Sequence, residues 1–387
     1  MASKGSSYAN EDRREYRGAT VDIPFLVLLL CLLAVGLVML YSASFAQSEY
    51  DTSYEISTRY LRKQAVCAVI GLIAMWVFSR IPAVIWYKMA WPLYGISILL
   101  LLSVLVIGEE VNGARRWINI AGLQFQPSEV AKFTMILLFA RLTRTFGQRA
   151  KKFRHGVLGF GLALLGILVP LALEKHLSAI MLMGMVAVVM MYVAGTHPKW
   201  LLAGAGAAVV FVVVYISFMG YAGDRVTAWL HPEADPGDTG YQILQSLYAI
   251  GSGGLFGLGL GKSKQKYLYL PFQYNDYIFA IICEELGLFG AVLIMALFGM
   301  LILRGYWIAL RASDRFSTVL AAGLITLIAV QTVLNLGVVT NLLPSTGIAL
   351  PFFSYGGTAL AVNLGEMGII LNISRQRDEI KKQEDFL

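Results

Sequence analysis

The sequence predicts an all-α integral membrane protein with about ten transmembrane helices. Its 387 residues are 57% hydrophobic and only 14% charged, and the mean hydropathy is +0.66. A water-soluble domain of this length needs far more polar surface than such a composition supplies. Apolar runs of 18 or more residues recur along the chain, each long enough to cross a hydrocarbon core of roughly 30 Å as a helix. A helix also satisfies every backbone group internally, as a segment without access to water must.

Each predicted span follows one of these apolar runs. The first starts near Val21 and continues past Ser44, which is too long for a cleaved signal segment and indicates a retained helix. Two spans within 156–196 are joined by a short connection, residues 174–176. The expected spans are 22–46, 61–79, 83–107, 127–145, 156–173, 178–196, 200–221, 277–303, 316–343 and 351–373. The three cysteines fall inside these runs without metal-ligand spacing and are expected to pack in the core: Cys31, Cys67 and Cys283.

Lys and Arg residues are distributed unequally between the two sides of these spans. With ten spans both tails share a side, and its segments hold 20 of the 31 Lys and Arg residues, against ten opposite and Lys132 within a span. Positively charged loops stay in the cytoplasm. We therefore expect cytoplasmic tails at 1–21 and 374–387 and a membrane domain at 22–373. The net charge of +7 then faces anionic head groups. A nucleic-acid-binding protein is excluded, because no basic patch is interleaved with exposed aromatic residues.

One predicted outer connection, residues 222–276, is 55 residues long. Loops of this length in a compact architecture are usually functional or disordered. Apolar residues recur here at helical spacing, which predicts a helix lying at the membrane interface. These residues are Tyr241, Ile243, Leu244, Leu247, Tyr248 and Ile250.

A glycine-rich run, 251–263, follows this helix and ends like a phosphate-binding P-loop. Phe256 stands where that motif requires glycine, and no strand precedes it, so we reject the P-loop interpretation. Two interpretations remain. Backbone N–H groups of the run, with nearby lysines, hold a pyrophosphate, or the run is a flexible hinge with solvated lysines. The lysines are Lys262, Lys264 and Lys266.

Asp276 stands where this loop re-enters the membrane, within the sequence Tyr-Asn-Asp-Tyr. A carboxylate there is partly desolvated, a condition under which carboxylates act as general bases. The alternative is a helix N-cap, for which Asp is favoured, and position alone does not separate the two. Glu366, deeper in the last predicted span, is a further candidate for a buried carboxyl group.

The outer loop before the fourth span contains two more candidates. Glu129 and Lys132 are spaced i, i+3, so they share a helix face and can pair. A charge near the bilayer centre costs roughly 2.5–3.5 kcal/mol on insertion scales, which favours a functional role over a purely structural ion pair. Arg115 and Arg116 are placed to bind phosphate, unless one of them snorkels to the interface. In the last outer loop, prolines and glycines between 344 and 357 imply a broken helix that lines a cavity.

These segments together resemble the SEDS family (shape, elongation, division and sporulation), bacterial membrane enzymes that polymerise peptidoglycan glycan strands. The similarity extends from about residue 22 to residue 374, and the first helix is closer to division and sporulation members than to elongation members. The strongest segments are Gly113–Trp117 with Gln126–Lys132, Gln245–Gly261, Asp276–Gly287 and Pro344–Gly357.

The resemblance implies that Asp276 is the catalytic carboxylate of an inverting glycosyl transfer. It implies lipid II as substrate, a growing undecaprenyl-pyrophosphate-linked strand as donor, and a class B penicillin-binding protein and other division proteins as partners. A divalent cation, Mg or Mn, remains an open question. Expected substrate-binding or supporting residues are Arg115, Arg116, Glu129, Lys132, Gln245, Ser246, Lys264, Lys266 and Ser354.

Two departures from the family pattern limit what can be transferred. Phe272 stands where many members carry Glu, and His176 stands where many carry Asp, so the roles of those carboxylates do not transfer. Two other functions remain as alternatives: a lipid II flippase, which also needs polar groups within the membrane, and a catalytically silent scaffold for a transpeptidase.

Overall fold

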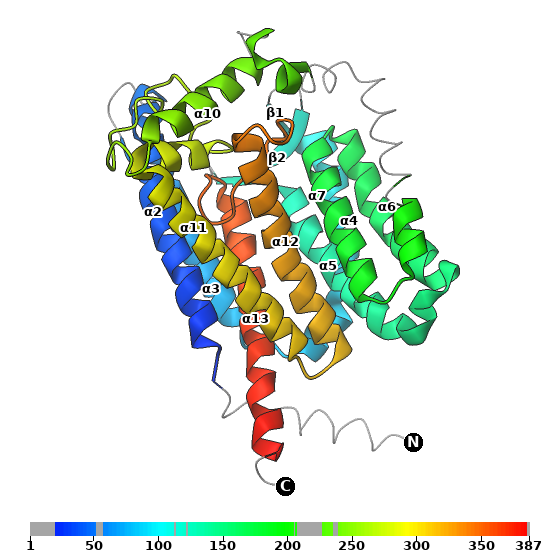
Figure 1. Ribbon diagram of the computed structural model, residues 1–387. Coiled ribbons are helices and arrows are strands. Elements are labelled where there is room, and N and C mark those ends of the chain that lie inside the picture. The colour runs from blue at the N-terminus through cyan, green and yellow to red at the C-terminus, as the bar shows by residue number, and fades with distance from the viewer. Residues whose placement is uncertain are drawn as a thin grey trace, which may run out of the picture.

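The computed structural model of this protein describes residues 20–51, 57–111, 114–120, 123–204, 206, 227–234 and 239–384. Long helices form a bundle, with one small sheet at one end (Figure 1). The prediction of a helical membrane protein is confirmed. The long helices are α2 (Ile23–Asp51), α3 (Arg59–Phe78), α4 (Ala83–Ile107), α5 (Pro127–Phe146), α6 (Phe160–Leu173), α7 (Leu177–Val193), α10 (Thr239–Gly253), α11 (Ile278–Leu310), α12 (Arg315–Val339) and α13 (Gly357–Glu384).

Six described segments are long and apolar enough to span a membrane: α2, α3, α4, residues 154–173, α11 and α12. Helix α7 is equally apolar but has only 17 residues. Helix α5 contains four charged residues, Glu129, Lys132, Arg141 and Arg144, which lower its hydropathy. Most of the predicted span 200–221 lies outside the described residues. The expected total of ten helices therefore stays a prediction.

Parts of other predictions also lie outside the described residues. These are residues 1–19 of the first tail, 385–387 of the last tail, and 222–226 and 235–238 of the long outer loop. The helix expected in that loop is present as α10, and its place at the membrane interface stays a prediction. It is fixed to α12 by Ser246, whose buried hydroxyl donates a hydrogen bond of 2.8 Å to the carbonyl of Val339.

The connection between α4 and α5 forms an antiparallel sheet in the order β1-β2-β3, which the sequence analysis did not predict. Its strands are β1 (Glu109–Val111), β2 (Ala114–Ile120) and β3 (Leu123–Phe125). An available signal was the Asn-Gly pair at 112–113, since this dipeptide between alternating residues favours a hairpin.

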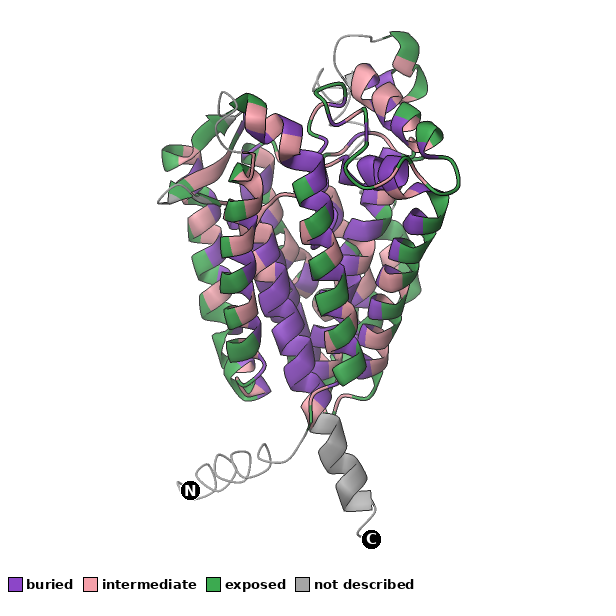
Figure 2. Ribbon diagram, turned by 90° about the vertical axis from the view of Figure 1, so that its left-hand side faces the viewer, coloured by how far each residue is buried: buried purple, intermediate pink, exposed green. Residues whose placement is uncertain are grey.

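Helix α12 occupies the centre of the bundle. Within its best membrane-spanning window 78% of residues are buried, against at most 39% in the other five spans. Figure 2 shows buried residues on the central helices and exposed ones along the outer faces. Cys67 and Cys283 are buried as expected, but the prediction for Cys31 was wrong. Its side chain is exposed, because it lies on the outer side of α2, where a membrane protein presents apolar residues to lipid.

The end of the bundle opposite the sheet is where α2 begins and α13 ends (Figure 1). Asp22 joins these elements there. Arg304 of α11 donates hydrogen bonds to both carboxylate oxygens of Asp22, with Nη2 to Oδ2 at 2.8 Å, and the Asp22 amide donates to the hydroxyl of Ser374. Asp22 is almost fully buried, so this bidentate pair links α11 to the start of α2 at this end of the bundle.

Candidate active site

Asp276 lies at the sheet end of the bundle, just before α11. The N-cap residue of α11 is Tyr277, whose side chain makes no capping hydrogen bond, so Asp276 stands one residue before the N-cap position. Its carboxylate is partly exposed and faces Gly347: a Cβ atom at that position would lie 3.3 Å from Asp276 Oδ2. Gly347, with φ +66°, thus leaves the carboxylate room that a side chain would fill.

The backbone around Asp276 is held by α12 and by the irregular segment 344–356. Asn335 of α12 donates hydrogen bonds of 2.7 Å to the carbonyls of both Asp276 and Ile348. Ser354 donates to the carbonyl of Asn275 at 2.6 Å. Ser354, expected at the site, therefore positions the backbone next to the carboxylate. Asn335 was not predicted, although a buried amide inside an apolar run is itself a signal of function.

The irregular segment itself agrees with the prediction of a broken helix. Helix α13 begins only at Gly357, six residues after the predicted start of the last span, and Phe352 has φ +66°. Gln64 of α3 supports the segment by donating to the carbonyl of Ser354 at 3.1 Å and accepting from the amide of Gly356 at 3.2 Å. These bonds satisfy backbone groups that no helix satisfies here.

Deeper in the bundle lies a central charge cluster, formed by Glu129, Lys132, His176 and Glu366. The predicted ion pair is confirmed: Lys132 Nζ lies 2.8 Å from Glu129 Oε2, and both side chains are at least 90% buried. Glu366 of α13 is 2% exposed and interacts electrostatically with both of them. Neither carboxylate oxygen of Glu366 has a hydrogen-bond partner within the described part of the chain.

Only one of the two predicted phosphate-binding arginines turns towards this cluster. Neighbouring residues of a strand point to opposite faces. Arg115 of β2 is half-exposed and lies 3.5 Å from Glu110, whereas Arg116 Nη2 donates to the carbonyl of Lys175 at 2.5 Å. Arg116 thereby lies beside the connection between α6 and α7.

That connection contributes two titratable groups. Burial raises the pKa of Glu174 to about 8, and the nearby Arg116 guanidinium only partly offsets this. Burial also lowers the pKa of His176 to about 3, and the positive charges of Arg116 and Lys132 lower it further. His176 is therefore neutral at physiological pH, and it connects Arg116 with the central charge cluster.

Asp276 and the cluster meet the same irregular segment. Ser178, two residues after His176, donates a hydrogen bond to the carbonyl of Thr346, and the next residue, Gly347, faces Asp276. The site therefore combines the Asp276 carboxylate with two cations, Lys132 of the cluster and Arg116 of β2. No group of three His, Cys, Asp or Glu side chains suited to a metal ion occurs among the described residues, so we derive no step through a divalent cation.

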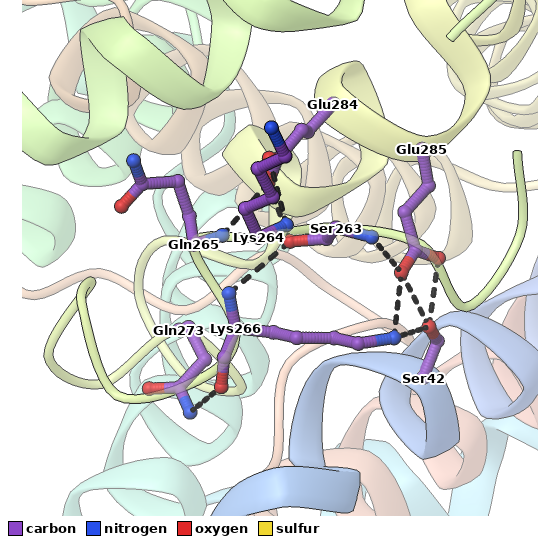
Figure 3. A network of polar contacts seen from close by, with 8 residues as sticks. All are labelled: Ser42, Ser263, Lys264, Gln265, Lys266, Gln273, Glu284 and Glu285. Carbon is purple, nitrogen blue, oxygen red and sulfur yellow. Dashed lines mark hydrogen bonds and ion pairs between the residues drawn. The ribbon is translucent and has the colours of Figure 1, made fainter. Parts of the chain in front are cut away.

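A second polar network, the loop latch, lies beside this site and consists of Ser42, Ser263, Lys266, Glu284 and Glu285 (Figure 3). Lys266 Nζ lies 3.0 Å from Glu285 Oε1, and both side chains are almost fully buried. Ser42 of α2 donates to Glu285 at 2.7 Å. Glu284 accepts hydrogen bonds from the hydroxyl of Ser263 and, at 2.9 Å, from the amide of Lys264.

Packing against the latch residues explains why the run 251–263 is rich in glycine. Gly287 interrupts α11 with φ +67°, and a Cβ there would lie 2.3 Å from the amide nitrogen of Gly257. The run packs this closely because its amides at 258 and 259 donate to the carbonyls of Glu284 and Glu285. Lys266 thus has a protein partner, whereas the predicted residues Lys264 and Gln245 remain exposed and partly exposed.

Comparison with known proteins identifies the family. Residues 23–379 match the profile described as "Cell cycle protein" for FtsW, RodA and SpoVE. The chain belongs to the FtsW/RodA/SpoVE family. It is 40% identical to "Probable peptidoglycan glycosyltransferase FtsW" of Geobacter metallireducens, over 91% of this chain and 94% of that one. It is 39% identical to "Stage V sporulation protein E" of Bacillus subtilis, over 92% and 97%.

Solved structures agree with this membership of the FtsW/RodA/SpoVE family. A chain from a study of polymerization and crosslinking by a peptidoglycan synthase complex superposes with TM-score 0.78, at 29% identity over 92% of this chain and 98% of that one. The RodA protein of Thermus thermophilus superposes with TM-score 0.69, at 28% identity over 92% and 97%. The predicted SEDS resemblance, to its division and sporulation branch, is confirmed, and the protein is a membrane glycosyltransferase.

Proposed function

We propose that this protein polymerises glycan strands from lipid II at the outer face of the bacterial cytoplasmic membrane, with Asp276 as the general base. The observation that carries the proposal is the setting of Asp276. Its carboxylate is partly exposed and faces a glycine, while its backbone is fixed by Asn335. A partly exposed carboxylate whose backbone is held in place is suited to take a proton from a substrate.

In the proposed reaction Asp276 accepts the proton of the 4-hydroxyl of the acceptor sugar. The hydroxyl oxygen attacks the anomeric carbon of the donor, its configuration inverts, and the bond to the lipid pyrophosphate breaks. Negative charge then develops on the leaving group. Lys132 and Arg116 are the cations whose placement near the charge cluster suits that charge, with Glu129 orienting Lys132.

The proposal includes the topology. Ten helices would place both tails in the cytoplasm and residues 222–276 outside, and the shared end of the first and last described helices supports this. A class B penicillin-binding protein is the proposed partner, supported by the similarity to a chain of a synthase complex. A role in cell division, with other division proteins, is supported by relatives named FtsW.

Polymerisation of purified lipid II, with and without the partner, tests the function. Asp276→Asn is expected to reduce polymer formation by at least about 100-fold, the usual minimum contribution of general acid–base catalysis, while the protein stays monodisperse in detergent. Glu110→Gln is the control and should retain activity, because Glu110 is an exposed carboxylate at the sheet end of the bundle. Polymerisation retained by Asp276→Asn would overturn the assignment. A flippase would move lipid II across vesicles without forming polymer, and a scaffold would tolerate Asp276→Asn in cells.

A further inference from the structure

A cavity of about 300 Å³ is lined by part of the segment that leads to Asp276, and no residue of the central charge cluster lines it. The end of α2 contributes Gln47 to its wall, and the segment that leads to Asp276 contributes Leu268, Pro271, Phe272 and Tyr274. This volume is at the small end of the range of roughly 300–1,000 Å³ found for ligand pockets. It therefore suits a single ring rather than an extended chain.

Two residues of the wall adopt a conformation that large side chains avoid. Leu268 has φ +66° and Phe272 has φ +55°, values at which an L side chain is crowded by its own backbone. Both side chains are nevertheless exposed, by 46% and 44%, so burial of apolar surface does not compensate for the strain. Strain of this kind is concentrated at sites where a ligand is held.

Two residues of the cavity wall, Gln47 and Tyr274, belong to a polar and aromatic group. Gln47 Nε2 donates to Asp51 Oδ1 at 2.8 Å, and the hydroxyl of Tyr60 donates to the same carboxylate. The hydroxyl of Tyr274 donates to that of Tyr60 at 3.4 Å, and their rings pack at a tilt of 37° with centroids 4.5 Å apart. Tyr355 packs on Tyr60 edge to face, at 5.0 Å. Amide, carboxylate, phenol and aromatic groups are thus linked to the cavity wall through Gln47 and Tyr274.

Tyr274 connects this cavity with the catalytic carboxylate. Its phenol interacts electrostatically with both Asp51 and Asp276, and its carbonyl accepts a hydrogen bond of 2.9 Å from the amide of Tyr355. A residue of the cavity wall is therefore electrostatically coupled to the group that takes the proton in the proposed reaction.

We propose that this cavity is a sugar subsite that binds one pyranose ring of the lipid-linked saccharide during polymerisation. A pyranose presents C–H groups on its faces and hydroxyl groups around its edge. The C–H groups, with their partial positive charge, fit the negative face of an aromatic ring such as Phe272. The hydroxyl groups fit the amide of Gln47 and the carboxylate of Asp51. The inference rests on the proposed function, because that function supplies the sugar.

Steady-state kinetics with lipid II test the subsite in the purified full-length protein with its partner. Phe272→Ala should raise KM for lipid II by about tenfold and leave kcat within about twofold, the pattern of lost ground-state and transition-state binding alike. Phe272→Trp should keep the wild-type KM, since it retains an aromatic face. Phe256→Ala is the matched control: Phe256 is 82% exposed and belongs to a separate apolar groove, so its KM should not change.

A binding measurement separates failure of the subsite from failure of the proposed function. Chitotetraose, a β-1,4-linked N-acetylglucosamine oligomer, is titrated into wild type and Phe272→Ala in detergent. Saturable binding to wild type that weakens about tenfold in Phe272→Ala supports the subsite, even if wild type forms no polymer from lipid II. An unchanged KM in an active Phe272→Ala protein, or equal chitotetraose binding by both proteins, would overturn it.

Discussion

Two buried lysines in this protein have similar exposure and different surroundings. Lys266 lies in the loop latch, where Glu285 accepts from Ser42, from the Ser263 amide and from the lysine itself. Lys132 lies in the central charge cluster, where the neighbouring Glu366 has two carboxylate oxygens without a hydrogen-bond partner among the described residues. Both lysines are at most 5% exposed.

This difference indicates that the loop latch has a structural role and that the central charge cluster belongs to the active site. A buried polar network whose members are all bonded fixes one geometry and strengthens the fold. Buried polar atoms without partners cost free energy, typically about 1–3 kcal/mol each, so a buried water molecule or a ligand normally completes such a network. We therefore infer that the latch stabilises the fold and that the cluster takes part in the reaction. Four experiments test this inference.

The largest effect is expected from breaking the latch. Lys266→Met leaves Glu285 as an uncompensated buried charge and should lower the free energy of unfolding by about 3–5 kcal/mol. Thermal unfolding in detergent measures this. Lys266→Met combined with Glu285→Leu removes both charges and should recover more than half of the loss. A stable single variant would show that the latch contributes little.

The same substitution in the cluster should affect activity as well as stability. Lys132→Met removes a cation proposed to stabilise the leaving pyrophosphate, and loss of one such group typically costs about 10²–10³ in kcat. It also leaves the buried carboxylate of Glu129 without its cation, so kcat is measured below the unfolding temperature of the variant. If folded Lys132→Met keeps its kcat, the cluster does not serve the reaction.

A backbone substitution tests the latch without changing any charge. Gly287→Ala places a Cβ atom 2.3 Å from Gly257 N at φ +67°, so the unfolding free energy should fall by about 2–3 kcal/mol. Gly299→Ala is the control on the same helix, since no atom lies within 4 Å of its added Cβ. Equal unfolding temperatures for the two variants would contradict the close packing of the glycine-rich run.

The smallest expected effect is a pH dependence of the unfolding free energy, caused by Glu174 beside the cluster. The pKa of Glu174 is raised to about 8 from 4.5, so between these values the unfolded chain releases this proton and the folded chain keeps it. The folded state is therefore progressively disfavoured as pH rises from about 4.5 to 8. Glu174→Gln should raise the unfolding temperature relative to wild type at pH 8 but not at pH 4.5. Glu233→Gln, at an exposed carboxylate, should show no such pH dependence; a constant difference for Glu174→Gln would refute the shift.

The sequence predicted those parts of the site that depend on local spacing. Glu129 and Lys132 are one helical turn apart, so their pairing followed from helix geometry, and prolines and glycines predicted the irregular segment before α13. The other contacts of the site could not be predicted, because they join residues far apart in the sequence. Asn335 reaches Asp276 across 59 positions and Ser42 reaches Glu285 across 243, and no local pattern encodes such pairs.

By itself the sequence determined that the chain enters a membrane as helices, because apolar length and charge distribution act on each segment separately. Only the tertiary structure decided which polar residues have partners. Lys266 looked as available for phosphate as Lys264, yet packing buries one against Glu285 and leaves the other exposed. Hydrogen bonding and desolvation depend on neighbours that folding brings together from distant parts of the chain.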